Sequence, residues 1–140
     1  MAKLRYVSRE ELNEDKLHIY DHLAETRGSV LNIFRTLLNS PDAAEVVTAV
    51  GEYIRFKSLL DPMTREITIL SVARETNTAY EWAQHEPIAR SEGVSLTTID
   101  AIRSGRAPMG IPAKEGIFAQ AAREIVRKGE MTDRTYQAVE

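Results

Sequence analysis

Residues 61–85 read DPMTREITILSVARETNTAYEWAQH, and this stretch decides the fold. Asp61 followed by Pro62 is typical of a helix start, because an aspartate N-cap accepts backbone hydrogen bonds and a proline in the first turn needs no donor. Apolar residues then recur at helical spacing until the pattern weakens before Asn77. Asn77 is a suitable cap for a second helix, which we expect to reach Gly93. The stretch predicts two consecutive helices with a short connection.

Similar start and stop signals mark the rest of the chain. Ser8 and Glu11 have the spacing of a capping box, which predicts a helix from about Arg9. Other signals predict a helix that ends at Gly28, one over 41–60, one between Ser95 and Gly105, one over 112–129, and a last one from Thr132 or Asp133. No segment of the sequence shows the period-two alternation of a strand or a repeat of solenoid length. The sequence therefore predicts an all-α fold.

Composition and charge narrow the class of protein. A chain of 140 residues, 43% hydrophobic and 28% charged, has the size and composition of one globular domain, so we expect a single domain over 1–140. The net charge is -3 and the chain has no basic block, so we expect no nucleic-acid partner. It has neither an apolar signal-peptide core nor a run of ~18 apolar residues, so we expect no membrane association and a cytoplasmic location.

Glu66 is the most informative position in the sequence. On a helical wheel for the helix that begins at Pro62, its carboxylate lies in the middle of the apolar stripe. The stripe consists of Met63, Ile67, Ile69, Leu70 and Ala73, and the opposite side carries Thr64, Thr68, Ser71 and Glu75. A buried carboxylate costs several kcal/mol unless a donor or a proton compensates it, so we expect Glu66 to have a hydrogen-bond partner from another element.

The next helix offers that partner. Thr78, Glu81, Trp82 and His85 share one arc, because they are separated by three, four or seven residues. His85 is the side chain whose ordinary pKa suits proton transfer near neutral pH, and Glu81 lies one turn before it. We therefore expect Glu66 and His85 to lie within hydrogen-bond reach in a pocket with Glu81 and Trp82. Two interpretations stay open at this point: an acid/base site, or a buried polar pair that only orients two helices.

The two remaining histidines raise the question of a metal site. His18 and His22 are four residues apart and Glu25 continues the same face, a spacing that can chelate a metal ion. The neighbouring residues are lysines and glutamates, and the chain has no zincin motif. We interpret this face as a solvated helix surface and predict no metal site.

The two segments together resemble the carboxymuconolactone decarboxylase family. The resemblance rests on LDPMTRE at 60–66 and YEWAQH at 80–85, and it extends over roughly 19–105. In the branch that resembles alkylhydroperoxidase D, a glutamate is followed after eleven intervening residues by Cys-x-x-Cys and, after three more, by a histidine. Glu66 and His85 match the two ends of that pattern, whereas Thr78 and Glu81 occupy the cysteine positions. The chain has no cysteine, so it lacks the atoms of a thiol peroxidase.

The resemblance implies more about fold and assembly. It implies an alkylhydroperoxidase D-like helical bundle that forms a homo-oligomer, commonly a trimer or a hexamer, with pockets between helices near the Glu and His. It also implies a further apolar C-terminal helix. Because the sequence ends at Glu140, we expect either that this helix is cut short or that the chain is a shorter relative. The family's decarboxylases work without a cofactor, so none is expected.

Three functions are compatible with the resemblance and the residues. The first is a cofactor-free lyase or isomerase that acts on a small carboxylated or lactone-type metabolite. Its catalytic residues would be Glu66, Glu81 and His85, and Thr78 and Trp82 would bind the substrate. The second is an oligomer that binds a small ligand without turnover. The third is a cysteine-less relic of the peroxidase branch that retains only the scaffold.

Overall fold

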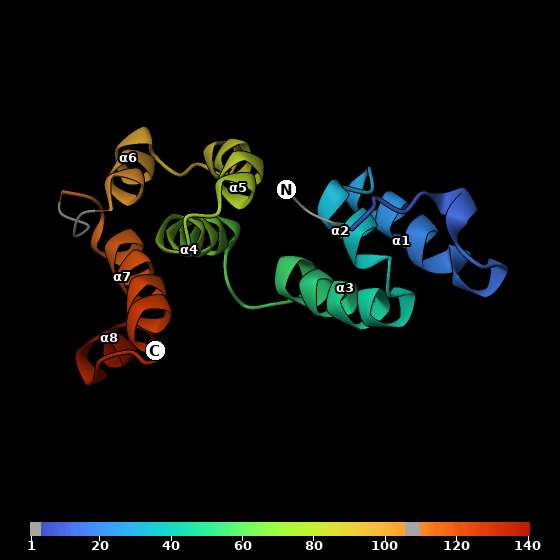
Figure 1. Ribbon diagram of the computed structural model, residues 1–140. Coiled ribbons are helices and arrows are strands. Elements are labelled where there is room, and N and C mark those ends of the chain that lie inside the picture. Colours follow the sequence, from blue (N-terminus) through green and yellow to red (C-terminus); the bar gives the residue numbers. More distant parts are fainter. Residues whose placement is uncertain (1–3, 106–109) are drawn as a thin grey trace. The chain divides into compact units, whose positions relative to one another are not determined.

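The computed structural model describes residues 4–105 and 110–140. Within these residues all regular structure is helical and no strand occurs, which confirms the predicted all-α class (Figure 1). The elements are two 3-10 turns, η1 (Arg9–Glu11) and η2 (Glu14–Lys16), and the helices α1 (Leu17–Arg27), α2 (Asn32–Leu37), α3 (Pro41–Phe56), α4 (Pro62–Glu75), α5 (Ala79–Ser91), α6 (Leu96–Ser104), α7 (Ala113–Lys128) and α8 (Asp133–Val139). None of the helices in the described ranges is both long and apolar enough to span a bilayer.

The chain divides into two compact units, Met1–Ser58 and Leu59–Glu140. The expectation of a single domain over 1–140 stays a prediction. The first unit contains α1, α2 and α3, which surround a small apolar core of Val7, Ile19, Leu23, Leu38 and Ala44. Burial of each larger aliphatic side chain contributes ~1.5–3 kcal/mol, so this core holds the three helices together.

The start of the first unit differs from the sequence prediction. The Ser8 backbone N–H donates to the Glu11 carboxylate at 2.8 Å, as the capping-box spacing predicts. However, the α-helix begins at Leu17 and not near Arg9. The reason is that Leu12 leaves the helical conformation, with φ -86° and ψ 147°, so the capping box closes only one 3-10 turn. The helix ends as predicted at Gly28, whose φ of 74° favours glycine.

The end of α3 also differs from the prediction. The helix stops at Phe56 and does not continue to Leu60. Two backbone amides, those of Lys57 and Ser58, donate to the same Tyr53 carbonyl, so the regular pattern of one bond per residue ends here. The Ser58 hydroxyl donates to the Ile54 carbonyl at 2.7 Å. A serine that bonds to the preceding turn competes with helix propagation, which explains the early stop.

The second unit is built around α4. This helix contacts α5, α6 and α7, and α8 packs on α7 (Figure 1). Three helices therefore cover α4 and exclude water from most of its surface. The core consists of Ile67, Leu70, Ala89, Val94, Ile99, Ile102 and Ala119.

The connection between α4 and α5 consists of Thr76, Asn77 and Thr78, and its backbone bonds decide where one helix ends and the next begins. Asn77 has a φ of 53°, a left-handed conformation that asparagine tolerates better than most residues. The Thr78 N–H then donates to the Ala73 carbonyl at 2.9 Å, which closes the end of α4. Thr78, and not Asn77, is therefore the N-cap of α5. The predicted cap was wrong by one residue because Asn77 terminates the first helix instead of starting the second.

Candidate functional site

Glu66 is completely buried in the second unit, with 0% of its surface exposed. The residue is on α4, where helices on several sides keep water away. The Arg65 guanidinium, itself buried, donates from Nε to Oε1 of Glu66 at 3.3 Å. A permanent cation beside the carboxylate offsets part of the cost of burying its charge.

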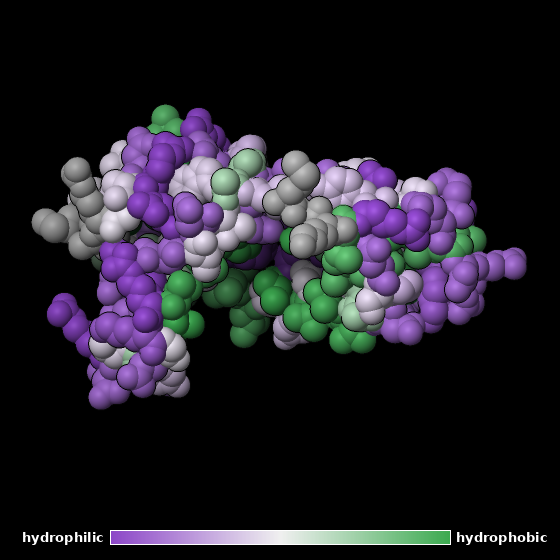
Figure 2. Space-filling view, viewed as in Figure 1, coloured by the Kyte–Doolittle hydropathy of each residue, from purple (hydrophilic) through white to green (hydrophobic). Residues whose placement is uncertain are grey.

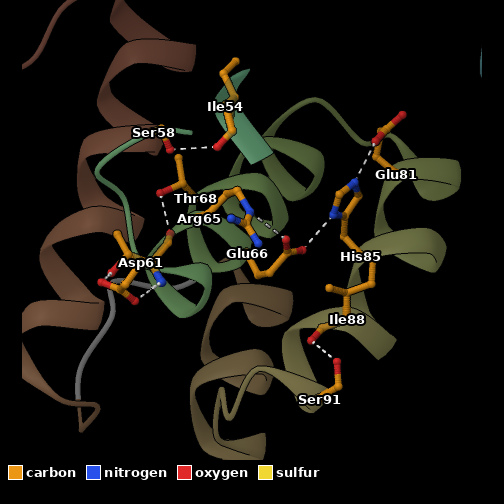
Figure 3. Close-up of polar contacts among 11 residues, drawn as sticks. Ile54, Ser58, Asp61, Arg65, Glu66, Thr68, Glu81, His85, Ile88 and Ser91 are labelled. Carbon is orange, nitrogen blue, oxygen red and sulfur yellow. Dashed lines mark hydrogen bonds and ion pairs between the residues drawn. The ribbon is translucent and has the colours of Figure 1, made fainter. Parts of the chain in front are cut away.

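His85 on α5 is the second partner of Glu66. Its Nδ1 lies 2.7 Å from Oε2 of Glu66, a direct hydrogen bond that confirms the predicted contact between these two side chains (Figure 3). The other ring nitrogen, Nε2, lies 3.6 Å from Oε2 of Glu81, which is beyond hydrogen-bond length. The His85 side chain is 18% exposed and the Glu81 side chain 32%. The imidazole therefore lies between a buried carboxylate and a solvated one.

The charge state of Glu66 follows from its surroundings. Burial is the largest influence and by itself raises the pKa of Glu66. The hydrogen bond and charge of His85, followed by those of Arg65, act in the opposite direction and hold the pKa of Glu66 below its ordinary value. Glu66 is consequently ionised at neutral pH and accepts hydrogen bonds. His85 must donate to it, so its proton is on Nδ1 and Nε2 carries the lone pair when the ring is neutral.

The side of α4 opposite Glu66 is not solvated as a surface helix would be. Thr64 and Ser71 are buried, at 3% and 1% exposure. The Ser71 hydroxyl satisfies itself by donating to the Ile67 carbonyl at 2.7 Å. Glu75, with an 8% exposed side chain, pairs with Arg123 and Arg127 of α7. A helical wheel could not reveal that this side of α4 is buried, because small hydroxyl residues are compatible with either water or a close helix contact.

The two expected substrate-binding residues lie beside a different space. Thr78 and Trp82 line an open depression of about 380 Å³. Its other lining residues are Ala73, Arg74, Asn77, Ala79 and Arg103. Glu66, Glu81 and His85 are not among them. The structure thus brings Glu66, His85 and Glu81 together in one row and places Thr78 and Trp82 at a neighbouring depression.

Trp82 belongs to a charged cluster that sequence reasoning missed. Its indole Nε1 donates to Oε2 of Glu86 at 2.6 Å. Arg103 on α6 pairs with the same carboxylate at 2.8 Å and lies over the indole, 5.3 Å from the ring centre. Hydrogen bonds from Arg103, then Arg90, then Trp82 lower the pKa of Glu86 to about 2. Part of this cluster could be found from sequence, because Trp82, Glu86 and Arg90 are spaced four residues apart; Arg103 could not.

Arg65 was also missed, although it is adjacent to Glu66 in the sequence. Consecutive helical residues point in directions about 100° apart, so a wheel separates them. The contact arises because the long arginine side chain bends back toward the carboxylate, and no sequence signal indicates such a rotamer. Burial of an arginine is itself rare and is here explained by the ionised glutamate.

His18 and His22 contact glutamates of α3. Nε2 of His18 lies 3.1 Å from Glu45, and Nε2 of His22 lies 2.7 Å from Glu52. The two rings thus have different carboxylate partners and do not converge on one point. Within the described ranges, no group of three or more His, Asp or Glu side chains is placed to hold a metal ion.

Comparison with known protein families gives a match that begins at α3 and ends within α7. The sequence model of the carboxymuconolactone decarboxylase family matches residues 41–124, more than half of the chain. The matched range contains α3 to α6 and most of α7, and it includes Glu66, Glu81 and His85. Comparisons with curated proteins and with solved structures give no match. The chain therefore belongs to the carboxymuconolactone decarboxylase family.

Proposed function

We propose that the protein is a cofactor-free acid/base lyase or isomerase that acts on a small carboxylated or lactone-type metabolite. The observation that carries the proposal is the 2.7 Å hydrogen bond between Glu66 and Nδ1 of His85. An ionised carboxylate at Nδ1 orients the ring, selects the tautomer and stabilises the imidazolium. Nε2 of His85 is then the atom that takes or gives the proton.

The three titratable residues have different tasks in this proposal. Glu66 is 0% exposed, so it acts through His85 and does not touch the substrate. His85 is the acid/base group. Glu81 is partly solvated and 3.6 Å from Nε2, so it can pass a proton between the imidazole and solvent.

A decarboxylation shows how the atoms balance. The bond between the carboxylate carbon and the adjacent carbon breaks, carbon dioxide leaves, and the electron pair forms an enolate. The imidazolium of His85 then donates its Nε2 proton to the enolate carbon, and the ring regains a proton from solvent through Glu81. An isomerisation would use the same residue first as base and then as acid.

The test is proton exchange in deuterated water. The wild-type protein is incubated with a panel of small lactone acids and β,γ-unsaturated acids, and NMR follows exchange at the carbon next to the carbonyl together with loss of carbon dioxide. We expect at least one compound to exchange faster than in buffer. A panel without any exchange, on a protein shown to be folded, would contradict the proposal and favour ligand binding without turnover.

Peroxide chemistry is expected to be absent. The chain contains no cysteine, so no residue can form the sulfenic acid or mixed disulfide that thiol-dependent peroxide reduction requires. We expect the rate with hydrogen peroxide and dithiothreitol to equal the rate in buffer. The double variant Thr78→Cys and Glu81→Cys is expected to gain reactivity toward a disulfide reagent. Turnover of peroxide by the wild type would refute this expectation.

We also propose that the chain forms a homo-oligomer, a trimer or a hexamer as the resemblance implies. One face of α3 exposes a continuous apolar stripe, visible as hydrophobic surface over that helix (Figure 2). The stripe consists of Val46, Val47, Val50, Tyr53, Ile54 and Phe56. Apolar patches of this kind on a helix are typical of protein interfaces.

The stripe predicts the effect of a charge on assembly. Val50→Glu is expected to weaken self-association by roughly tenfold or more, since an uncompensated charge in an apolar contact is strongly unfavourable. Sedimentation velocity at several concentrations measures the change. Ala83→Glu adds the same charge at an exposed position of α5 and should leave the mass unchanged. A wild-type monomer at all concentrations would contradict the proposal.

A further inference from the structure

The depression beside Thr78 has a chemical character of its own. Its lining comes from the end of α4, the start of α5 and the end of α6. The apolar part of the lining consists of Ala73, Ala79 and Trp82. The charged part consists of two arginines, Arg74 and Arg103, and no carboxylate is among the lining residues. A space with apolar walls and only positive charges favours a small organic anion.

The two arginines differ in how their charges are compensated. Arg103 donates to Asp100 at 2.6 Å and pairs with Glu86 at 2.8 Å, so its guanidinium already has two carboxylate partners. Arg74 donates from Nε to the Arg103 carbonyl at 2.7 Å. In the part of the chain that the structure describes, no carboxylate lies within ion-pair distance of Arg74. Arg74 is therefore the uncompensated positive charge of the depression.

The geometry of Arg74 suits one planar anion. The bond from Nε fixes the side chain and leaves both terminal amino groups for a ligand. Gly105 gives the guanidinium its room, because a Cβ there would come within 3.0 Å of the terminal nitrogen Nη2 of Arg74. Two parallel N–H groups match the two oxygens of a carboxylate. The apolar part of the lining favours an organic acid over an inorganic anion such as phosphate.

We propose that this depression binds the carboxylate of a small organic acid, with Arg74 as the bidentate donor and Trp82 as an apolar wall. The inference rests on the proposed function in that the organic acid is the substrate of the neighbouring Glu66–His85 pair. Ala79 is the first residue of α5, so the positive end of that helix faces the same space and adds to the attraction. The acid would be held at its carboxylate while its apolar part lies along Trp82.

The single tryptophan of the chain makes the site directly observable. Trp82 fluorescence is followed while sodium succinate is added to the 140-residue protein at constant ionic strength. We expect a saturable change with succinate and none with the neutral analogue succinamide. Arg74→Gln should weaken succinate binding by about tenfold or more, because it removes both the positive charge and the two parallel N–H donors of the guanidinium. Arg127→Gln, at an arginine outside the depression that pairs with Glu75, should bind as the wild type does.

A folding check, a second variant and two comparison ligands complete the test. Circular dichroism checks that Arg74→Gln is folded. If it is not, Arg74→Lys is used instead. This variant keeps the positive charge but loses the two parallel N–H donors, and it should weaken succinate binding roughly threefold. The proposal would be overturned by any of three results. These are an equal response to succinamide, tighter binding of sodium phosphate than of succinate, and unchanged succinate binding in the Arg74 variants. Binding is read without turnover, so failure here is distinct from failure of the acid/base function.

Discussion

Replacing His85 with glutamine is expected to lower the rate of proton exchange on an accepted substrate by roughly 10²–10⁴-fold, the usual contribution of a positioned acid/base group. The amide of glutamine can still donate a hydrogen bond to Glu66, which lies 2.7 Å from the imidazole in the wild type. It has no lone pair that accepts a proton near neutral pH. The chemistry is therefore lost while the helix contact is largely kept. NMR exchange rates in deuterated water measure the effect.

Two controls separate this loss from a loss of structure. His18→Gln makes the same change at an exposed histidine that contacts Glu45 on α3, and it should leave the exchange rate unchanged. The melting temperature of His85→Gln should stay close to that of the wild type. A His85→Gln variant with wild-type exchange would show that His85 is not the acid/base group. A variant that loses exchange only because it unfolds would favour the purely structural interpretation of the pair.

The second large effect concerns stability. Glu66→Ala is expected to lower the free energy of unfolding by ~3–5 kcal/mol, because it removes a fully buried carboxylate that neutralises the guanidinium of Arg65 and holds His85. A cavity where the side chain was adds to the cost. Urea denaturation followed by circular dichroism measures the change. Glu81→Ala removes a carboxylate that is partly solvated and should cost less than ~1 kcal/mol.

The lowered pKa of Glu66 adds a pH dependence with a definite sign. A carboxyl group whose pKa is lower in the folded state than in the unfolded state stabilises the fold above its unfolded pKa. That contribution is lost as the pH falls through the folded pKa. We therefore expect the gap in stability between the wild type and Glu66→Gln to be largest near neutral pH and to shrink in acid. A gap that grows as the pH falls would contradict the ionised state of Glu66.

Much of the candidate site could be predicted from the sequence because helical periodicity fixes which residues share a face. The burial of Glu66 follows from its place in an apolar stripe. The contact with His85 follows from the short connection at Asn77, which makes α4 and α5 neighbours. Local geometry was less predictable: whether Asn77 ends one helix or starts the next depends on a bond from Thr78 to the Ala73 carbonyl. Pattern alone cannot rank two competing local hydrogen bonds.

By itself, the sequence determined the all-α class, the order of most helices, the pairing of Glu66 with His85 and the lack of thiol chemistry. These depend on periodicity, local spacing and residue type, which a linear chain contains. Only the tertiary structure decided that α4 is covered on several sides, that Arg65 bends back onto Glu66, and that Arg103 lies over Trp82. It also placed the side chain of Arg74, a residue of α4, against the Arg103 carbonyl of α6 and beside an open depression. These contacts join residues through long, flexible side chains or across helices distant in sequence, and their geometry is set by packing, which no local pattern records.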